Sequence, residues 1–287
     1  MFDGIIVIAI ALKAGNYVAS LLCLGGPLFI MSFPAAGSGI RQVVKRVTIA
    51  CAILLPFLLM LRITTRSARI SGSGLDGMLD QVMLQIVWES PLGTFAVLQI
   101  LGAFLVFSAI RLKGFLYIGG LIGSLCLASS FATIGHSLGE PRLILAPLIV
   151  IHILFVGFWF ASLAPLYRAS MTPGGVVILH RFGVVASLAV PALAVVGLIF
   201  ASNMLGSWHS LVTTDYGVTL LAKLILVTAL LGLAAINKLK LVPEMALSTA
   251  SAGQGLRRSI LLEAGIMCAI LCVTAALTSV TTPPANL

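Results

Sequence analysis

Residues 143–166 read LILAPLIVIHILFVGFWFASLAPL, and this stretch contains no Asp, Glu, Lys or Arg. About 20 such residues are enough for an α-helix to cross the hydrocarbon core of a bilayer. A helix is required there, because lipid cannot satisfy open backbone groups. Seven further apolar stretches have a comparable character, at 4–33, 43–61, 92–110, 115–135, 177–205, 217–236 and 256–280. The pattern predicts an all-α, polytopic transmembrane helical bundle with eight spans.

The composition of the whole chain agrees with this prediction. Of the 287 residues, 60% are apolar and only 9% are charged, whereas a soluble domain carries about 25% charged residues to face water. The mean hydropathy is +1.17. We therefore expect residues 1–287 to form a single integral membrane domain, with the first apolar stretch retained as a span because it is too long for a signal peptide.

The basic residues predict how the chain is oriented in the membrane. One set of loops contains eleven of them: Arg41, Lys45, Arg46, Arg111, Lys113, Arg168, Arg181, Lys238, Lys240, Arg257 and Arg258. The opposite set contains four: Arg62, Arg66, Arg69 and Arg142. Cytoplasmic loops are enriched in Lys and Arg, so we expect the first set inside and both termini outside, on the periplasmic side of a bacterial inner membrane. Residues 62–91 are expected to form an outer loop with a short amphipathic helix.

Several polar residues fall within the apolar stretches: Lys13, Asn16, His152, Lys223 and Glu263. A charge near the centre of a bilayer costs about 2.5–3.5 kcal/mol on insertion scales, so each such residue needs a partner or a function. The lysines could extend to the lipid headgroups, and Glu263 could pair with Arg257 or Arg258. Alternatively, these residues are polar elements of a pathway through the membrane.

The histidines give the sharpest indication of a binding site. His136 follows the span 115–135 and His152 lies in the next span, so a short loop should bring them onto antiparallel neighbours. Trp159, seven residues after His152, shares its helix face. Met204 and His209 flank the outer end of the span 177–205. Imidazole and thioether donors suit a copper ion better than Mg²⁺ or Ca²⁺, although a single histidine in a helix is more often a hydrogen-bonded core residue.

No catalytic signature is present in the sequence. It contains no GxSxG, Walker A or HExxH motif, and a chain built of spans leaves no room for the large cytoplasmic domain of an ATP-driven pump. We therefore expect a binding or transport protein rather than an enzyme, with any transport passive, ion-coupled or assisted by a partner.

An ordered set of short motifs resembles the copper resistance protein D family. The motifs are Gly135-His136, His152, Trp159, Ser162 to Leu166, Gly206-Ser207, Thr214 to Gly217, Lys223, Asn237, Leu241-Val242-Pro243, Arg257-Arg258-Ser259, Glu263 and Thr278-Ser279. The resemblance implies an inner-membrane protein of copper transport and resistance that often works beside a small periplasmic copper-binding protein of the CopC type. It also implies that His136 and His152 are the leading metal ligands.

The chain departs from the family pattern in the first span. Family members often have an arginine and then a histidine where this chain has Lys13 and Asn16, so the ligand set here is either smaller or different. The sequence is also compatible with two other functions. One is a b-type haem redox protein with histidine axial ligands, and the other is a membrane assembly subunit that binds no metal.

Overall fold

The computed structural model describes residues 2–112, 115–135, 142–172, 174–247 and 250–280. Within these ranges the chain is helical and contains no strand, which confirms the all-α prediction. Eight of the described helices are long and apolar enough to cross a membrane. They belong to the segments Gly4–Ser32, Ser38–Ser71, Pro91–Arg111, Leu116–Thr133, Arg142–Ala169, Gly175–Leu205, Asp215–Ala246 and Gly253–Val280.

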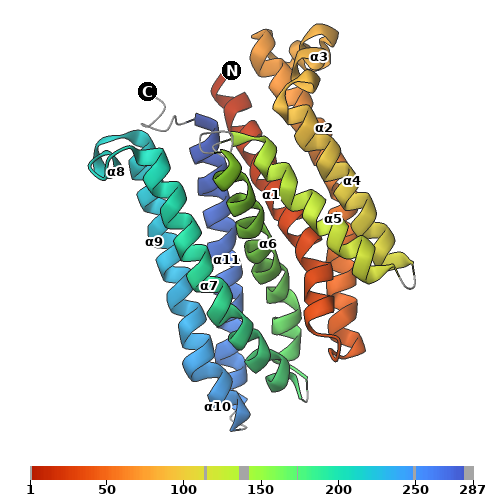
Figure 1. Ribbon diagram of the computed structural model, residues 1–287, viewed down its shortest axis with the longest axis vertical. Helices are drawn as coiled ribbons and strands as arrows, with labels where there is room; N and C mark the ends of the chain where they lie inside the picture. Colours follow the sequence, from red (N-terminus) through yellow and green to blue (C-terminus); the bar gives the residue numbers. More distant parts are fainter. Residues whose placement is uncertain (1, 113–114, 136–141, 173, 248–249, 281–287) are drawn as a thin grey trace. The chain divides into compact units, whose positions relative to one another are not determined.

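The described helices are labelled in chain order in Figure 1. The long ones are α1 (Phe2–Ser32), α2 (Ser38–Ser71), α4 (Pro91–Arg111), α5 (Leu116–Ser130), α6 (Arg142–Ala169), α7 (Gly175–Leu205), α9 (Asp215–Ile236) and α11 (Ala250–Val280). Shorter pieces connect them: η1 (Gly74–Leu79), α3 (Gln81–Glu89), η2 (Phe131–Thr133), α8 (Ser210–Thr213), η4 (Asn237–Leu241) and α10 (Val242–Ala246).

Helix α2 extends beyond residue 61, where we expected the span to end. It continues through Arg62, Arg66 and Arg69 to Ser71, because no Gly or Pro interrupts this part of the sequence. Gly72 then follows with a positive φ of 69°, the left-handed conformation in which a glycine commonly ends a helix. Part of the expected outer loop is therefore helix, and the arginines project from a regular helical surface.

The described chain forms two compact units. Unit 1 comprises residues 1–28 and 47–157, and unit 2 comprises residues 29–46 and 158–287. In unit 1, α4 and α5 lie side by side (Figure 1). They approach closely at two glycines, since a Cβ added to Gly102 would lie 2.9 Å from the carbonyl oxygen of Gly123. Small residues permit this kind of approach between membrane helices. In unit 2, α9 pairs with α11.

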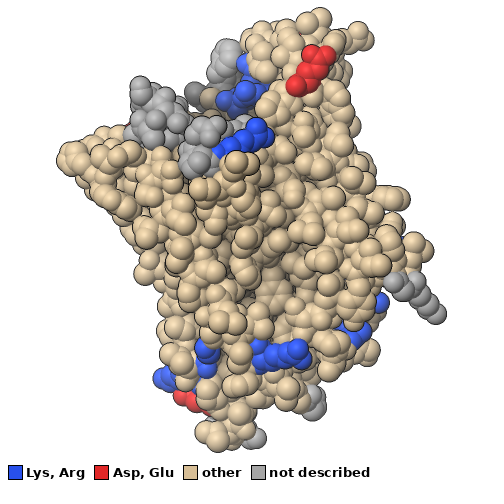
Figure 2. Space-filling view, in the orientation of Figure 1, with Lys and Arg blue, Asp and Glu red and all other residues tan. Residues whose placement is uncertain are grey.

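Charged side chains are concentrated near the helix ends. On the face drawn in Figure 2, the Lys and Arg side chains lie toward the ends of the helices, and tan, uncharged side chains cover the middle. This distribution is the one expected of helices that place an apolar middle section in lipid. The buried charges and amides described below are the exceptions to this distribution.

Candidate functional site

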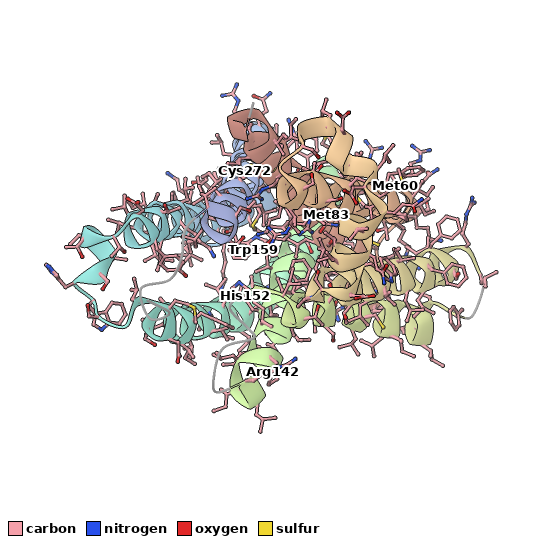
Figure 3. All side chains as sticks on the ribbon, turned by 90° about the horizontal axis from the view of Figure 1, so that it is seen from above. Met60, Met83, Arg142, His152, Trp159 and Cys272 are labelled. Atoms are coloured by element: carbon pink, nitrogen blue, oxygen red, sulfur yellow. The ribbon has the colours of Figure 1, made fainter. Side chains whose placement is uncertain are left out.

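The structure describes three of the four predicted metal ligands, because His136 lies outside the described residues. His152 is half-buried on α6. Trp159 follows two turns later on the same helix and is buried, with 6% of its surface exposed. Both are labelled along α6 in Figure 3. The predicted pairing of His136 with His152 therefore stays a prediction.

Met204 and His209 have different surroundings. Met204 is buried in an apolar cluster of unit 2, where it packs with Leu205, Tyr216 and Leu277. His209 is exposed in the turn between α7 and α8. Among the described residues, no group of three or more His, Cys, Asp or Glu side chains is arranged to hold a metal ion. The surroundings of Met204 are those of a packing residue.

In the first span, the side chain of Asn16 is engaged by a cation. It is fully buried, and its Oδ1 accepts a hydrogen bond of 2.5 Å from Nη1 of Arg62 on α2. The guanidinium of Arg62 also lies 5.0 Å from the centre of the Phe95 ring, within the range of a cation–π interaction. Lys13, one turn before Asn16, is close enough to Arg62 and Arg66 to be repelled by them. Asn16 is thus an amide in a positively charged environment.

A chain of buried polar groups continues from Asn16 into unit 1. The Ser20 hydroxyl lies 2.7 Å from the carbonyl oxygen of Asn16 and donates over 2.7 Å to Oε1 of Gln99 on α4. Gln99 in turn donates from Nε2 to Ser130 over 2.7 Å. All these side chains are fully buried. This network was not predicted from the sequence, although Gln99 in the middle of an apolar stretch indicates a buried polar group there.

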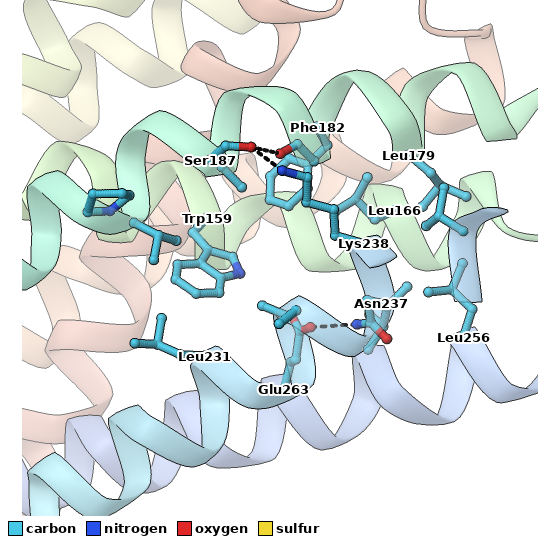
Figure 4. Close-up of a pocket in the computed structure, with 18 residues that line it drawn as sticks. Trp159, Leu166, Leu179, Phe182, Ser187, Leu231, Asn237, Lys238, Leu256 and Glu263 are labelled. Carbon is cyan, nitrogen blue, oxygen red and sulfur yellow. Dashed lines mark hydrogen bonds between the residues drawn. The ribbon is translucent and has the colours of Figure 1, made fainter. Parts of the chain in front are cut away.

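Unit 2 contains a cavity of about 240 Å³ between α6, α7, α9, η4, α10 and α11 (Figure 4). Most of the 18 residues around it are apolar. Leu256, Ile260 and Glu263 reach it from one face of α11 at the spacing i, i+4, i+7, and α7 contributes a similar face. Five polar side chains also line it: Trp159, Ser187, Asn237, Lys238 and Glu263.

Glu263 is the buried acid of this cavity, with 3% of its surface exposed. Its Oε1 accepts a hydrogen bond of 2.6 Å from Nδ2 of Asn237. The indole nitrogen of Trp159 is turned toward Glu263 in Figure 4 and interacts with its carboxyl, although the contact does not reach the geometry of a full hydrogen bond. Oδ1 of Asn237 is buried without a hydrogen-bond partner among the described residues. An unsatisfied buried oxygen of this kind is uncommon in native structures.

Lys238 holds a second polar contact on the opposite wall of the cavity. Its ammonium donates a short hydrogen bond to the Ser187 hydroxyl on α7, and that hydroxyl donates to the carbonyl oxygen of Gly183 over 2.7 Å. Both contacts are visible in Figure 4. Gly183 leaves room for the lysine, because a Cβ there would lie 3.3 Å from Cγ of Lys238.

A π-helical turn places Asn237 and Lys238 at the cavity. Helix α9 ends at Ile236, and residues Asn237–Leu241 form the turn before α10 begins. A π-turn inserts an extra residue into a helix and rotates the side chains that follow, and such turns are frequent at functional sites. Both residues lie in a segment whose sequence, NKLKL, looks like an ordinary basic helix end.

The hydrogen-bond partner of Glu263 is Asn237, rather than Arg257 or Arg258. Lys223 is half-buried on α9 and is not among the residues that line the cavity.

Residues 176–277 match the model of a protein family described as copper resistance protein D. The matched segment runs from α7 into α11 and includes all the cavity residues from Leu179 to Glu263. It confirms the resemblance seen in the second half of the sequence, and it does not extend to His136, His152 or Trp159. No curated protein and no solved structure matches the chain.

Proposed function

We propose that this chain, whose residues 176–277 match the copper resistance protein D family, binds copper at the outer side of the inner membrane and passes it across or into the membrane. The family match is the observation that carries the proposal. It supports a copper resistance membrane protein, and the eight apolar helices fit a multi-pass protein. The ligands, the side of entry and the transport step are the parts that we propose.

His136 and His152 are the proposed copper ligands. Imidazole nitrogen is a good donor for copper, and the two residues stand at corresponding positions in the motif that resembles the family. His209 is a further candidate, because it is exposed and available to a ligand. We assign Met204 to packing, since apolar side chains surround it. A small periplasmic copper-binding protein of the CopC type is the proposed partner.

The positively charged end of unit 1 limits where copper can bind. Lys13, Arg62 and Arg66 lie close together, and two unit charges 4 Å apart repel by about 4 kcal/mol at an effective dielectric of 20. Asn16 therefore offers no favourable place for a copper cation. The proposed ligand set does not include the first span, in contrast to the pattern common in the family.

The proposal is tested by measuring copper bound per chain. The full-length protein is purified in detergent, incubated with Cu(I) or Cu(II), desalted and analysed by atomic emission. We expect bound copper to be lost in the double variant His136→Ala/His152→Ala. His180→Ala is the matched control, because His180 is an exposed histidine at the start of α7. An unchanged amount of copper per chain in the double variant would contradict the assignment of His136 and His152 as ligands.

Copper accumulation in whole cells then tests transport and its direction. Cells that express the wild-type protein, the double variant or the His180→Ala control are exposed to copper, and cell-associated copper is measured over time. A difference between wild type and the double variant, with the control like wild type, supports transport. A strong Soret band in the visible spectrum of the purified protein would instead support the haem-binding alternative.

A further inference from the structure

The carboxyl of Glu263 is a charged group without a charged partner in the described structure. Asn237 supplies its hydrogen bond, and no described Lys or Arg forms an ion pair with it. An ionisable side chain within a membrane span is costly and commonly marks an ion or proton pathway. The 240 Å³ cavity beside Glu263 provides space for a compensating positive species.

The residues around the cavity restrict which positive species fits. Copper prefers nitrogen and sulfur donors, and none of the described residues that line the cavity is a His, Cys or Met. Hard metal cations such as Mg²⁺ and Ca²⁺ require six or more oxygen ligands. Among the described residues, only three side chains that line the cavity carry an oxygen atom: Ser187, Asn237 and Glu263. The ammonium of Lys238 on the same cavity opposes an additional metal ion.

A proton avoids the restrictions on donor type and ligand number, because it needs no coordination shell. Asn237 is suited to both protonation states of the acid. Its Nδ2 donates to the carboxylate, as observed. Its unpartnered Oδ1 is an acceptor that a carboxylic O–H can use after a rotation of the amide. The indole N–H of Trp159 is a second donor for the charged form.

We propose that Glu263 carries a proton whose binding and release are coupled to copper movement. In the binding step, hydronium in the cavity transfers its proton to the Glu263 carboxylate, which yields the carboxylic acid and a water molecule. In the release step, water takes the proton back and the carboxylate regains its hydrogen bond from Asn237. The coupling rests on the proposed copper function, whereas the protonation of Glu263 does not.

Other charged and titratable groups on the surrounding helices do not share the cavity. Lys238 on η4 is the described cation that lines it, and its contact is with Ser187. The others are not among the lining residues: Arg142, His152, Tyr167 and Arg168 on α6, His180 and Arg181 on α7, Asp215, Tyr216 and Lys223 on α9, Lys240 on η4, Glu244 on α10, and Arg257, Arg258, Cys268 and Cys272 on α11. Glu263 is thus the acid that a proton in this cavity would reach.

The first experiment measures the proton directly in the copper-free, full-length protein. Infrared difference spectra are recorded while pH is varied, and the C=O stretch of a protonated carboxyl is followed. We expect a titrating band that is absent from Glu263→Gln and retained in Glu244→Gln, which removes an acid outside the cavity. Identical spectra in wild type and Glu263→Gln would overturn the proposal, whatever the transport assays give.

The second experiment measures coupling in proteoliposomes that contain a pH-sensitive dye. A copper gradient should drive proton flux with the wild-type protein and with Glu244→Gln. With Glu263→Gln the flux should fall to the level of empty liposomes, while bound copper per chain is unchanged. Persistent copper-driven proton flux in Glu263→Gln would rule out coupling through this residue.

Failure of the copper function and failure of the proton site are distinguishable. If the wild-type protein binds no copper but the Glu263 band titrates, the copper proposal fails and the proton site stands. If copper is bound and moved but the band is missing, only the proton site fails. Should Glu263→Gln not fold, Glu263→Asp keeps a carboxyl, and a shifted, titrating band in that variant assigns the signal to the same position.

Discussion

The side-chain amide of Asn237 donates a 2.6 Å hydrogen bond to the buried carboxyl of Glu263, joining the π-turn after α9 to the middle of α11. The two residues are 26 positions apart in the sequence. The contact orients the acid toward a cavity that α6 and α7 close from the other side. The surroundings of the Glu263 carboxyl therefore depend on the π-turn that positions Asn237.

Replacement of this amide should destabilise unit 2. Asn237→Ala removes the 2.6 Å hydrogen bond to the buried Glu263 carboxyl, which should cost about 1–3 kcal/mol. The thermal unfolding midpoint in detergent should fall accordingly. Asn203→Ala is the control, because Asn203 is exposed and its amide donates to the carbonyl oxygen of Ile199 within the same helix. An unchanged midpoint in Asn237→Ala would contradict a structural role for the contact.

A histidine restored in the first span should not add a copper ligand. In Asn16→His the imidazole would stand next to the Arg62 guanidinium, whose Nη1 lies 2.5 Å from the Asn16 oxygen. Repulsion by that charge, about 4 kcal/mol at 4 Å and an effective dielectric of 20, disfavours a bound cation. Copper per chain should equal that of wild type. The double variant Asn16→His/Arg62→Gln removes the charge and should bind more copper, and a gain in Asn16→His alone would show that the charges do not exclude the ion.

The close approach of α4 and α5 should tolerate no added side chain. A Cβ on Gly102 would lie 2.7 Å from Cγ of Leu127 and 2.9 Å from the carbonyl oxygen of Gly123. Overpacking of this kind costs about 1–3 kcal/mol, so Gly102→Ala should lower the unfolding midpoint.

Gly232→Ala in α9 is the matched control for that substitution. No described atom outside the neighbouring backbone of α9 lies within 4 Å of its added Cβ, and alanine is favoured over glycine in a helix interior by about 0.5–1 kcal/mol. The control should therefore keep or raise the midpoint. Equal effects of the two substitutions would mean that α4 and α5 are not in close contact.

Met204 should behave as a packing residue. Met204→Leu conserves volume, and such exchanges in an apolar core usually cost less than about 1.5 kcal/mol. Bound copper per chain should therefore remain that of wild type. Met204→Ala should destabilise by about 2–5 kcal/mol through the cavity it leaves, without a specific effect on copper. A loss of copper in Met204→Leu at unchanged stability would make the thioether a ligand.

The helices themselves follow from local properties of the sequence. Apolar stretches of span length require helices in lipid, and all eight are present in the structure. The motifs of the second half also identified the family that residues 176–277 match. Helix ends were less predictable: α2 continues to Ser71 because its arginines favour a helix as much as the apolar residues before them.

The positions of the polar side chains relative to one another were decided by tertiary structure. Asn16, Lys13 and Glu263 were recognised as unusual from the sequence alone. The partners of Asn16 and Glu263, which are Arg62 and Asn237, depend on how helices distant in sequence are rotated and packed. A π-turn that no sequence pattern announced adds one residue of rotation and brings Asn237 to Glu263. Apolar composition determines which segments are helices. Close packing between the helices determines which polar groups meet, and this packing depends on contacts between residues far apart in the chain.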